Sequence, residues 1–114
     1  MDGAELYQEL MRLDRQLTAS IKALKANGVK AAQSESDYQV AKATEALLLK
    51  DSGMSVGLID LTVRGRRNVA EKRLQRDIDK VTYQANLEHI NAVKLQIRVL
   101  DAQIEREWGQ AKHE

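Results

Sequence analysis

The sequence predicts an all-α fold: a long antiparallel helical hairpin of the coiled-coil kind that dimerises into a four-helix bundle. The chain of 114 residues contains neither proline nor phenylalanine. It is rich in Ala, Leu, Glu, Lys, Arg and Gln, a composition typical of long helices. Two long stretches repeat apolar residues every three or four positions, and a short apolar stretch joins them. We therefore expect one helical-hairpin domain over residues 1–114.

The first helix is predicted from about residue 4 to residue 51, with Asp2 as a possible cap. Its apolar face consists of Leu6, Leu10, Leu13, Leu17, Ile21, Leu24, Gly28, Ala31, Tyr38 and Leu49. Asn27-Gly28 is the weakest point, because glycine costs a helix about 1 kcal/mol relative to alanine. Either the helix continues and Gly28, Ala31 and Ala32 let a neighbour approach closely, or a new helix starts at Ser34. We favour continuity because the apolar face stays in phase.

The connector is predicted over about residues 52–67 and contains a short helix. Ser52-Gly53 is the stop signal of the first helix, and Ser55 and Gly65 can bound the short helix. Its apolar residues are expected to point inward, as a plug over the end of the hairpin; the alternative is a surface that recognises a partner protein. These candidate contact residues are Leu58, Ile59, Leu61 and Val63.

The second helix is predicted from about residue 69 to residue 109, with Asn68 as its cap and Glu71 in its first turn. It has two apolar faces roughly 160° apart. The face expected to pack against the first helix consists of Leu74, Ile78, Val81, Ala85, Ala92, Leu95, Val99 and Ala102. The other face, the candidate oligomer interface, consists of Tyr83, Leu87, Ile90, Val93, Ile97, Leu100, Ile104 and Trp108.

A two-helix hairpin has no third element to cover that second face. An apolar face left in water forgoes roughly 25 cal/mol per Å² of burial and favours association. The sequence therefore predicts a homodimer or larger oligomer, with Trp108 as an anchor of the core or of the interface.

Residues suited to catalysis are scarce. The chain has no cysteine and two histidines, and no cluster of side chains has the spacing of metal ligands. Nor is there a glycine-rich phosphate loop. We predict neither an enzyme nor a cofactor or metal site. The acidic amino terminus does not resemble a signal peptide, and no run approaches the roughly 18 apolar residues of a membrane span. A cytoplasmic location without membrane contact is therefore expected.

Basic residues cluster at the end of the connector and the start of the second helix. These candidate phosphate or partner contacts are Arg64, Arg66, Arg67, Lys72, Arg73 and Arg76. Arginine suits bidentate phosphate contact, so one hypothesis is a nucleic-acid-binding tip. The alternative, which we favour, is a solvated group paired with Asp51, Asp60, Asp77 and Asp79. Without interleaved aromatic residues, single-stranded binding is less expected.

Several motifs resemble a group of short, uncharacterised helical proteins of tailed phages and prophages of Gram-positive bacteria. They are LLLKDSGM (47–54), DL (60–61), RG (64–65), VAE (69–71), ANLEHINAVKLQIR (85–98) and EREW (105–108). The resemblance covers about residues 30–108 and implies a small accessory factor inside an infected or lysogenic bacterium. The leading hypothesis is a non-enzymatic adaptor or inhibitor of a host protein. A nucleic-acid-associated factor and a structural subunit of a phage particle are the alternatives.

Overall fold

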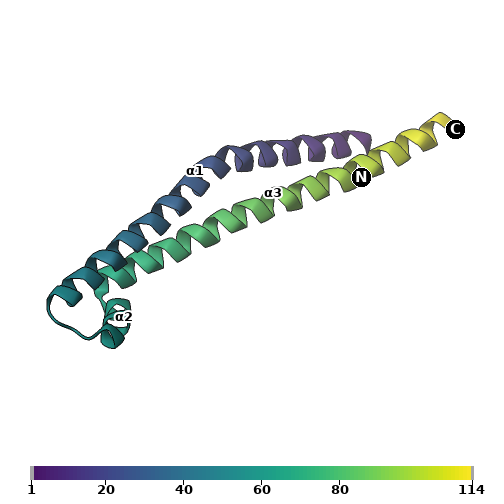
Figure 1. The fold of residues 1–114 in the computed structure, drawn as a ribbon. Helices are drawn as coiled ribbons and strands as arrows, with labels where there is room; N and C mark the ends of the chain where they lie inside the picture. Colours follow the sequence, from purple (N-terminus) through teal and green to yellow (C-terminus); the bar gives the residue numbers. More distant parts are fainter. Residues whose placement is uncertain (1, 114) are drawn as a thin grey trace. The chain divides into compact units, whose positions relative to one another are not determined.

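The computed structural model describes residues 2–113, and side chains for residues 2–109. Three helices follow one another: α1 (Gly3–Asp51), α2 (Val56–Gly65) and α3 (Arg67–His113) (Figure 1). Residues 2–113 contain no strand. The prediction of an all-α fold is confirmed. None of the helices in the described part of the chain is both long and apolar enough to cross a membrane.

Residue contacts group the chain into two compact units. The first unit comprises Met1–Lys25 and Ala85–Glu114, and the second comprises Ala26–Gln84. In each unit a segment of α1 lies antiparallel beside a segment of α3. In the first unit Ser20 pairs with Asn86, and in the second unit Ser34 pairs with Asp79.

A capping box starts α1. The backbone N–H of Glu5 donates to Asp2 Oδ1 at 2.8 Å, and the backbone N–H of Asp2 donates to Glu5 Oε2 at 3.2 Å. Each acidic side chain thus satisfies a backbone donor that the first turn of a helix leaves free. The predicted cap at Asp2 is confirmed.

α1 continues through Gly28, as the phase of its apolar face predicted. A Cβ atom at Gly28 would lie 3.2 Å from Cε2 of Tyr83, so the glycine does allow a close approach. Ser34 does not restart the helix: it lies inside α1, and its hydroxyl donates to Asp79 on α3. One residue of the predicted face is misplaced: Ile21 is exposed.

The end of α1 lies at Asp51, as predicted. Gly53 has a φ of +89°, and Met54 N–H donates to the Leu49 carbonyl at 3.1 Å while Gly53 N–H donates to Lys50 at 3.0 Å. This is the Schellman pattern, in which a left-handed glycine lets the chain satisfy the last carbonyls of a helix. The local stop signal therefore fixes the boundary.

α2 occupies the predicted connector and has the predicted bounds, with Ser55 at its N-cap and Gly65 as its last residue. Ser55 is the N-cap residue without a side-chain cap bond. α3 begins at Arg67, because the Arg66 carbonyl already accepts the N–H of Ala70 at 2.9 Å. Asn68 therefore lies inside α3 instead of capping it, and its side chain donates to Glu45 on α1 at 3.1 Å.

Each unit has its own apolar core. In the first unit the core consists of Leu6, Leu13, Val93 and Leu100, flanked by Leu10, Leu17, Ile97 and Ile104. In the second unit it consists of Tyr38, Leu49, Val63 and Val69, flanked by Ala41, Ala46, Met54 and Ile59. Because α2 contributes Val63 and Ile59, it packs on the end of α1 and the start of α3, as the plug interpretation predicted.

The roles of the two faces of α3 are the reverse of the prediction. Ile90, Val93 and Leu100 are buried against α1 of the same chain and are not left for a second copy. The face expected to pack against α1 is exposed instead. Periodicity could not choose between the faces because both repeat every three or four residues. The side of α3 that faces α1 also carries Asp79 and Asn86, which pair with Ser34 and Ser20 of α1.

Candidate functional site

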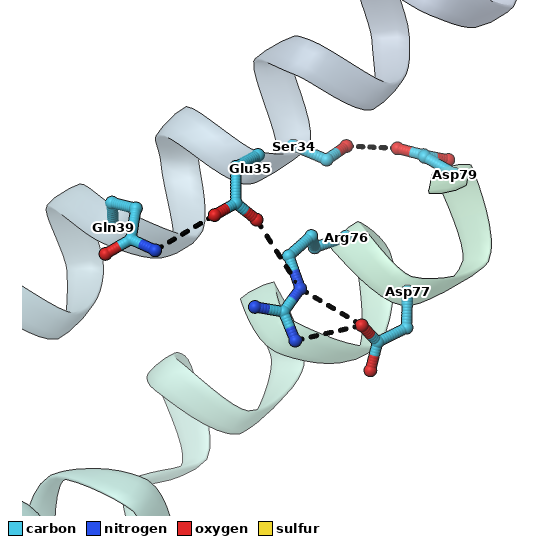
Figure 2. Close-up of polar contacts among 6 residues, drawn as sticks. All are labelled: Ser34, Glu35, Gln39, Arg76, Asp77 and Asp79. Carbon is cyan, nitrogen blue, oxygen red and sulfur yellow. Dashed lines mark hydrogen bonds and ion pairs between the residues drawn. The ribbon is translucent and has the colours of Figure 1, made fainter. Parts of the chain in front are cut away.

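A buried polar pair lies in the second unit, between α1 and α3 (Figure 2). The hydroxyl of Ser34 donates to Asp79 Oδ2, and both residues are buried. Gln75 Nε2 donates to Asp79 Oδ1 at 2.9 Å, and Lys30 Nζ lies 3.7 Å from the same oxygen. The hydrogen bond from Ser34 is the main reason that the pKa of Asp79 is lowered. This cluster is fully partnered and therefore acts as a structural contact.

Arg76 forms the next polar layer along α3. Its guanidinium lies 4.3 Å from the centre of the Tyr38 ring, within the range of a cation–π contact. It also pairs with Glu35 at 3.6 Å and with Asp77 at 2.9 Å (Figure 2). The guanidinium of Arg76 is thus already bound by two carboxylates and an aromatic ring, and a phosphate would have to compete with these partners.

The other predicted basic residues are only partly paired. Arg64 pairs with Asp60 at 2.8 Å and Arg66 with Glu45 at 3.7 Å, while Arg73 donates to the Arg64 carbonyl at 3.4 Å. The predicted pairings with Asp60 and Asp77 occur, whereas Asp79 pairs with Lys30. Within residues 2–109, Arg67 and Lys72 form no ion pair.

α2 presents an apolar surface that the sequence assigned to the interior. Ile59 and Val63 pack inward, as predicted, but Leu58 is 54% exposed and Leu61 is 68% exposed. The prediction that all four residues turn inward is wrong for these two. In a ten-residue helix, positions 58 and 61 share a face that lies away from positions 59 and 63. These two exposed leucines, about one turn apart, form an apolar surface on this short helix.

The end of the first unit contains a groove of about 590 Å³ between the start of α1 and the end of α3. Its apolar lining includes Leu6, Leu10, Ile104 and Trp108. Trp108 is 68% exposed, so within the chain it is not the core anchor that was predicted. Leu87 is also exposed, whereas Tyr83 is half-buried against Gly28.

α3 carries exposed apolar side chains in both units. Leu74, Ile78 and Val81 lie on it in the second unit, and Leu95 and Val99 lie on it in the first. Periodicity found this row but assigned it to the interior. Among the described residues, no group of three or more His, Cys, Asp or Glu side chains could hold a metal ion.

A scan against protein-family models and searches of curated proteins and of solved structures found no match.

Proposed function

We propose that this chain is a non-enzymatic accessory protein of a phage or prophage, and that it acts by binding another protein through α2. The exposed pair Leu58 and Leu61 supports the binding surface. The phage context rests on the resemblance over residues 30–108. In this context the partner is a protein of the bacterial cytoplasm, and the chain serves as its adaptor or inhibitor.

The mode of binding follows from the position of the two leucines. They lie at i and i+3 on one face of a helix that Val63 and Ile59 hold in place from the other side. Two such anchors fit an apolar groove on a partner, as in complexes where a short amphipathic helix fills a groove. Truncating a well-buried interface anchor commonly costs a complex about 2 kcal/mol or more.

Affinity capture from a lysate of a Gram-positive bacterium tests this proposal. The test variant is the double substitution Leu58→Glu and Leu61→Glu, compared with wild type in the presence and absence of nuclease. The matched control is Val40→Glu with Leu47→Glu, which places the same charges on exposed apolar positions of α1 in the same unit. Circular dichroism checks that both variants remain helical.

We expect wild type and control to capture the same protein and the α2 variant to lose it, with no effect of nuclease. Equal capture by all three proteins would overturn the α2 surface. Loss of capture after nuclease treatment would favour the nucleic-acid alternative. Purification with phage particles would instead favour a structural subunit.

A further inference from the structure

An unbroken heptad pattern runs along the outward face of α3. From Leu74 the positions advance alternately by four and three residues, as in the seam of a left-handed coiled coil. They are Leu74, Ile78, Val81, Ala85, Glu88, Ala92, Leu95, Val99 and Ala102, here called the outer row. Its five large apolar side chains are between 49% and 63% exposed. The row spans about four heptads, enough to indicate a coiled-coil partner.

We propose that a second copy of this chain packs antiparallel against the outer row, α3 against α3. This goes beyond the proposed function, which uses α2 and a different protein. It also differs from the predicted dimer, whose interface residues Val93 and Leu100 are buried against α1.

In one register, each large apolar side chain of one outer row lies opposite an apolar side chain of the other. With Ile78 opposite Leu95 of the second copy, Leu74 lies opposite Val99, and Val81 lies opposite Ala92. Each of these layers occurs twice through the two-fold symmetry. At the centre, Glu88 lies opposite Ala85, and the small alanine leaves the glutamate side chain room to reach solvent.

Charges beside the row favour this register. Asp77 and Arg98 occupy equivalent heptad positions next to the seam, and such positions face one another in an antiparallel pair. In the proposed register Asp77 of one copy therefore lies beside Arg98 of the other, at two symmetric places. Arg98 forms no ion pair among residues 2–109, and the Asp77 side chain is 55% exposed, so both can reach across.

Two competing arrangements place like charges together. A parallel, in-register pair would place Glu88 against Glu88 inside the seam, where desolvation makes the repulsion expensive. An antiparallel pair shifted by one heptad toward the carboxyl terminus would place Asp77 beside Glu105 of the second copy. Charge complementarity thus favours the proposed register over these two arrangements.

A charge-swap cycle tests the register, with sedimentation equilibrium of the full chain as the measurement. Asp77→Arg and Arg98→Asp each replace two attractive pairs by two repulsive ones. We expect each single variant to weaken dimerisation roughly tenfold. The double variant, with the charges exchanged, should recover most of that loss. A double variant as weak as the product of its singles overturns the register, and a monomeric wild type overturns the dimer.

Cysteine cross-linking tests the direction, because the chain has no cysteine of its own. In the double variant Ile78→Cys with Leu95→Cys, the two thiols of opposite copies meet in one layer. In the single variants the equivalent thiols lie about 25 Å apart, given 1.5 Å per helical residue. We expect a covalent dimer after oxidation of the double variant only. A covalent dimer of the single Leu95→Cys variant indicates a parallel pair and contradicts the proposal.

The proposed binding surface on α2 and the proposed dimer interface on α3 can be refuted independently. Leu58→Glu with Leu61→Glu should leave the dimer mass unchanged, because α2 lies outside the outer row. Loss of dimerisation in that variant, with its helicity intact, would contradict the proposed interface. Capture of a partner protein by a monomeric chain would support the proposed function and refute the dimer.

Discussion

The hydroxyl of Ser34 donates a hydrogen bond to the carboxylate of Asp79, and both residues are buried although 45 positions separate them in the sequence. A buried carboxylate is stable only when its oxygens have partners. Asp79 receives these from Ser34, Gln75 and Lys30. The pair therefore fixes the alignment of α1 and α3 within the second unit, in the way that a polar residue specifies the register of a coiled coil.

Acidification should destabilise the protein through Asp79. Because its pKa in the folded state is lowered, the charged carboxylate stabilises the fold above its unfolded pKa of about 3.9. This stability is lost as the pH falls through the lower, folded pKa. We expect the melting temperature at pH 7 to exceed that at pH 3, and Asp79→Asn to reduce the difference. Asp14→Asn is the matched control, because Asp14 is an exposed aspartate of α1. Thermal circular dichroism measures both, and an equal effect of the two variants would contradict the role of Asp79.

Removing the Ser34 hydroxyl, which donates to Asp79, should lower the stability of the fold at any pH at which Asp79 is charged. Ser34→Ala leaves one carboxylate oxygen buried without its partner. We expect the melting temperature at pH 7 to fall by several degrees. Ser36→Ala, at an exposed position two residues along α1, is the control and should change little. A Ser34 variant as stable as the control would show that solvent replaces the lost bond.

The glycines should respond differently to replacement by alanine. A Cβ atom added at Gly57 would have open space around it, so Gly57→Ala should raise stability by up to about 1 kcal/mol through helix propensity. At Gly28 the new Cβ meets the Tyr83 ring at 3.2 Å, so the gain should be smaller or absent. Gly53→Ala should destabilise by about 1–2 kcal/mol, because φ there is +89°. Urea denaturation gives the order, and a larger gain at Gly28 than at Gly57 would refute the close contact.

Alanine substitutions at buried and at exposed apolar positions of α1 should differ clearly in their cost to stability. Leu13 is 3% exposed in the core of the first unit, so Leu13→Ala should cost about 2 kcal/mol or more by leaving a cavity. Ile21→Ala, at an exposed position of the same unit, should cost less than about 1 kcal/mol. Chemical denaturation measures both. Similar losses at the two positions would mean that Ile21 is covered in solution.

Nucleic acid should bind weakly or not at all. Arg64, Arg66 and Arg76 already pair with carboxylates, so few cations remain to release counterions from a phosphate backbone. We expect no measurable affinity for duplex DNA in a low-salt titration. Binding that falls steeply with salt and disappears in Arg66→Glu and Arg67→Glu would reverse this expectation in favour of the basic tip.

Sequence reasoning succeeded where the signal is local. The cap at Asp2, the continuity of α1 through Gly28 and its stop at Gly53 all follow from residues within one or two turns. It failed where the sequence offers two alternative packing arrangements with the same apolar spacing. Both faces of α3 have coiled-coil spacing, and the apolar count of α2 does not reveal that Leu58 and Leu61 face away from Val63.

The sequence alone determined that this chain is helical, where its helices begin and end within a few residues, and that α3 has two apolar faces. These features depend on local propensity, capping and period. Only the tertiary structure decided which face of α3 meets α1. Ser20 and Ser34 satisfy Asn86 and Asp79 there, and pairing across distant segments is a property that no local pattern contains. The same pairing leaves Leu74, Ile78, Val81, Leu95 and Val99 exposed.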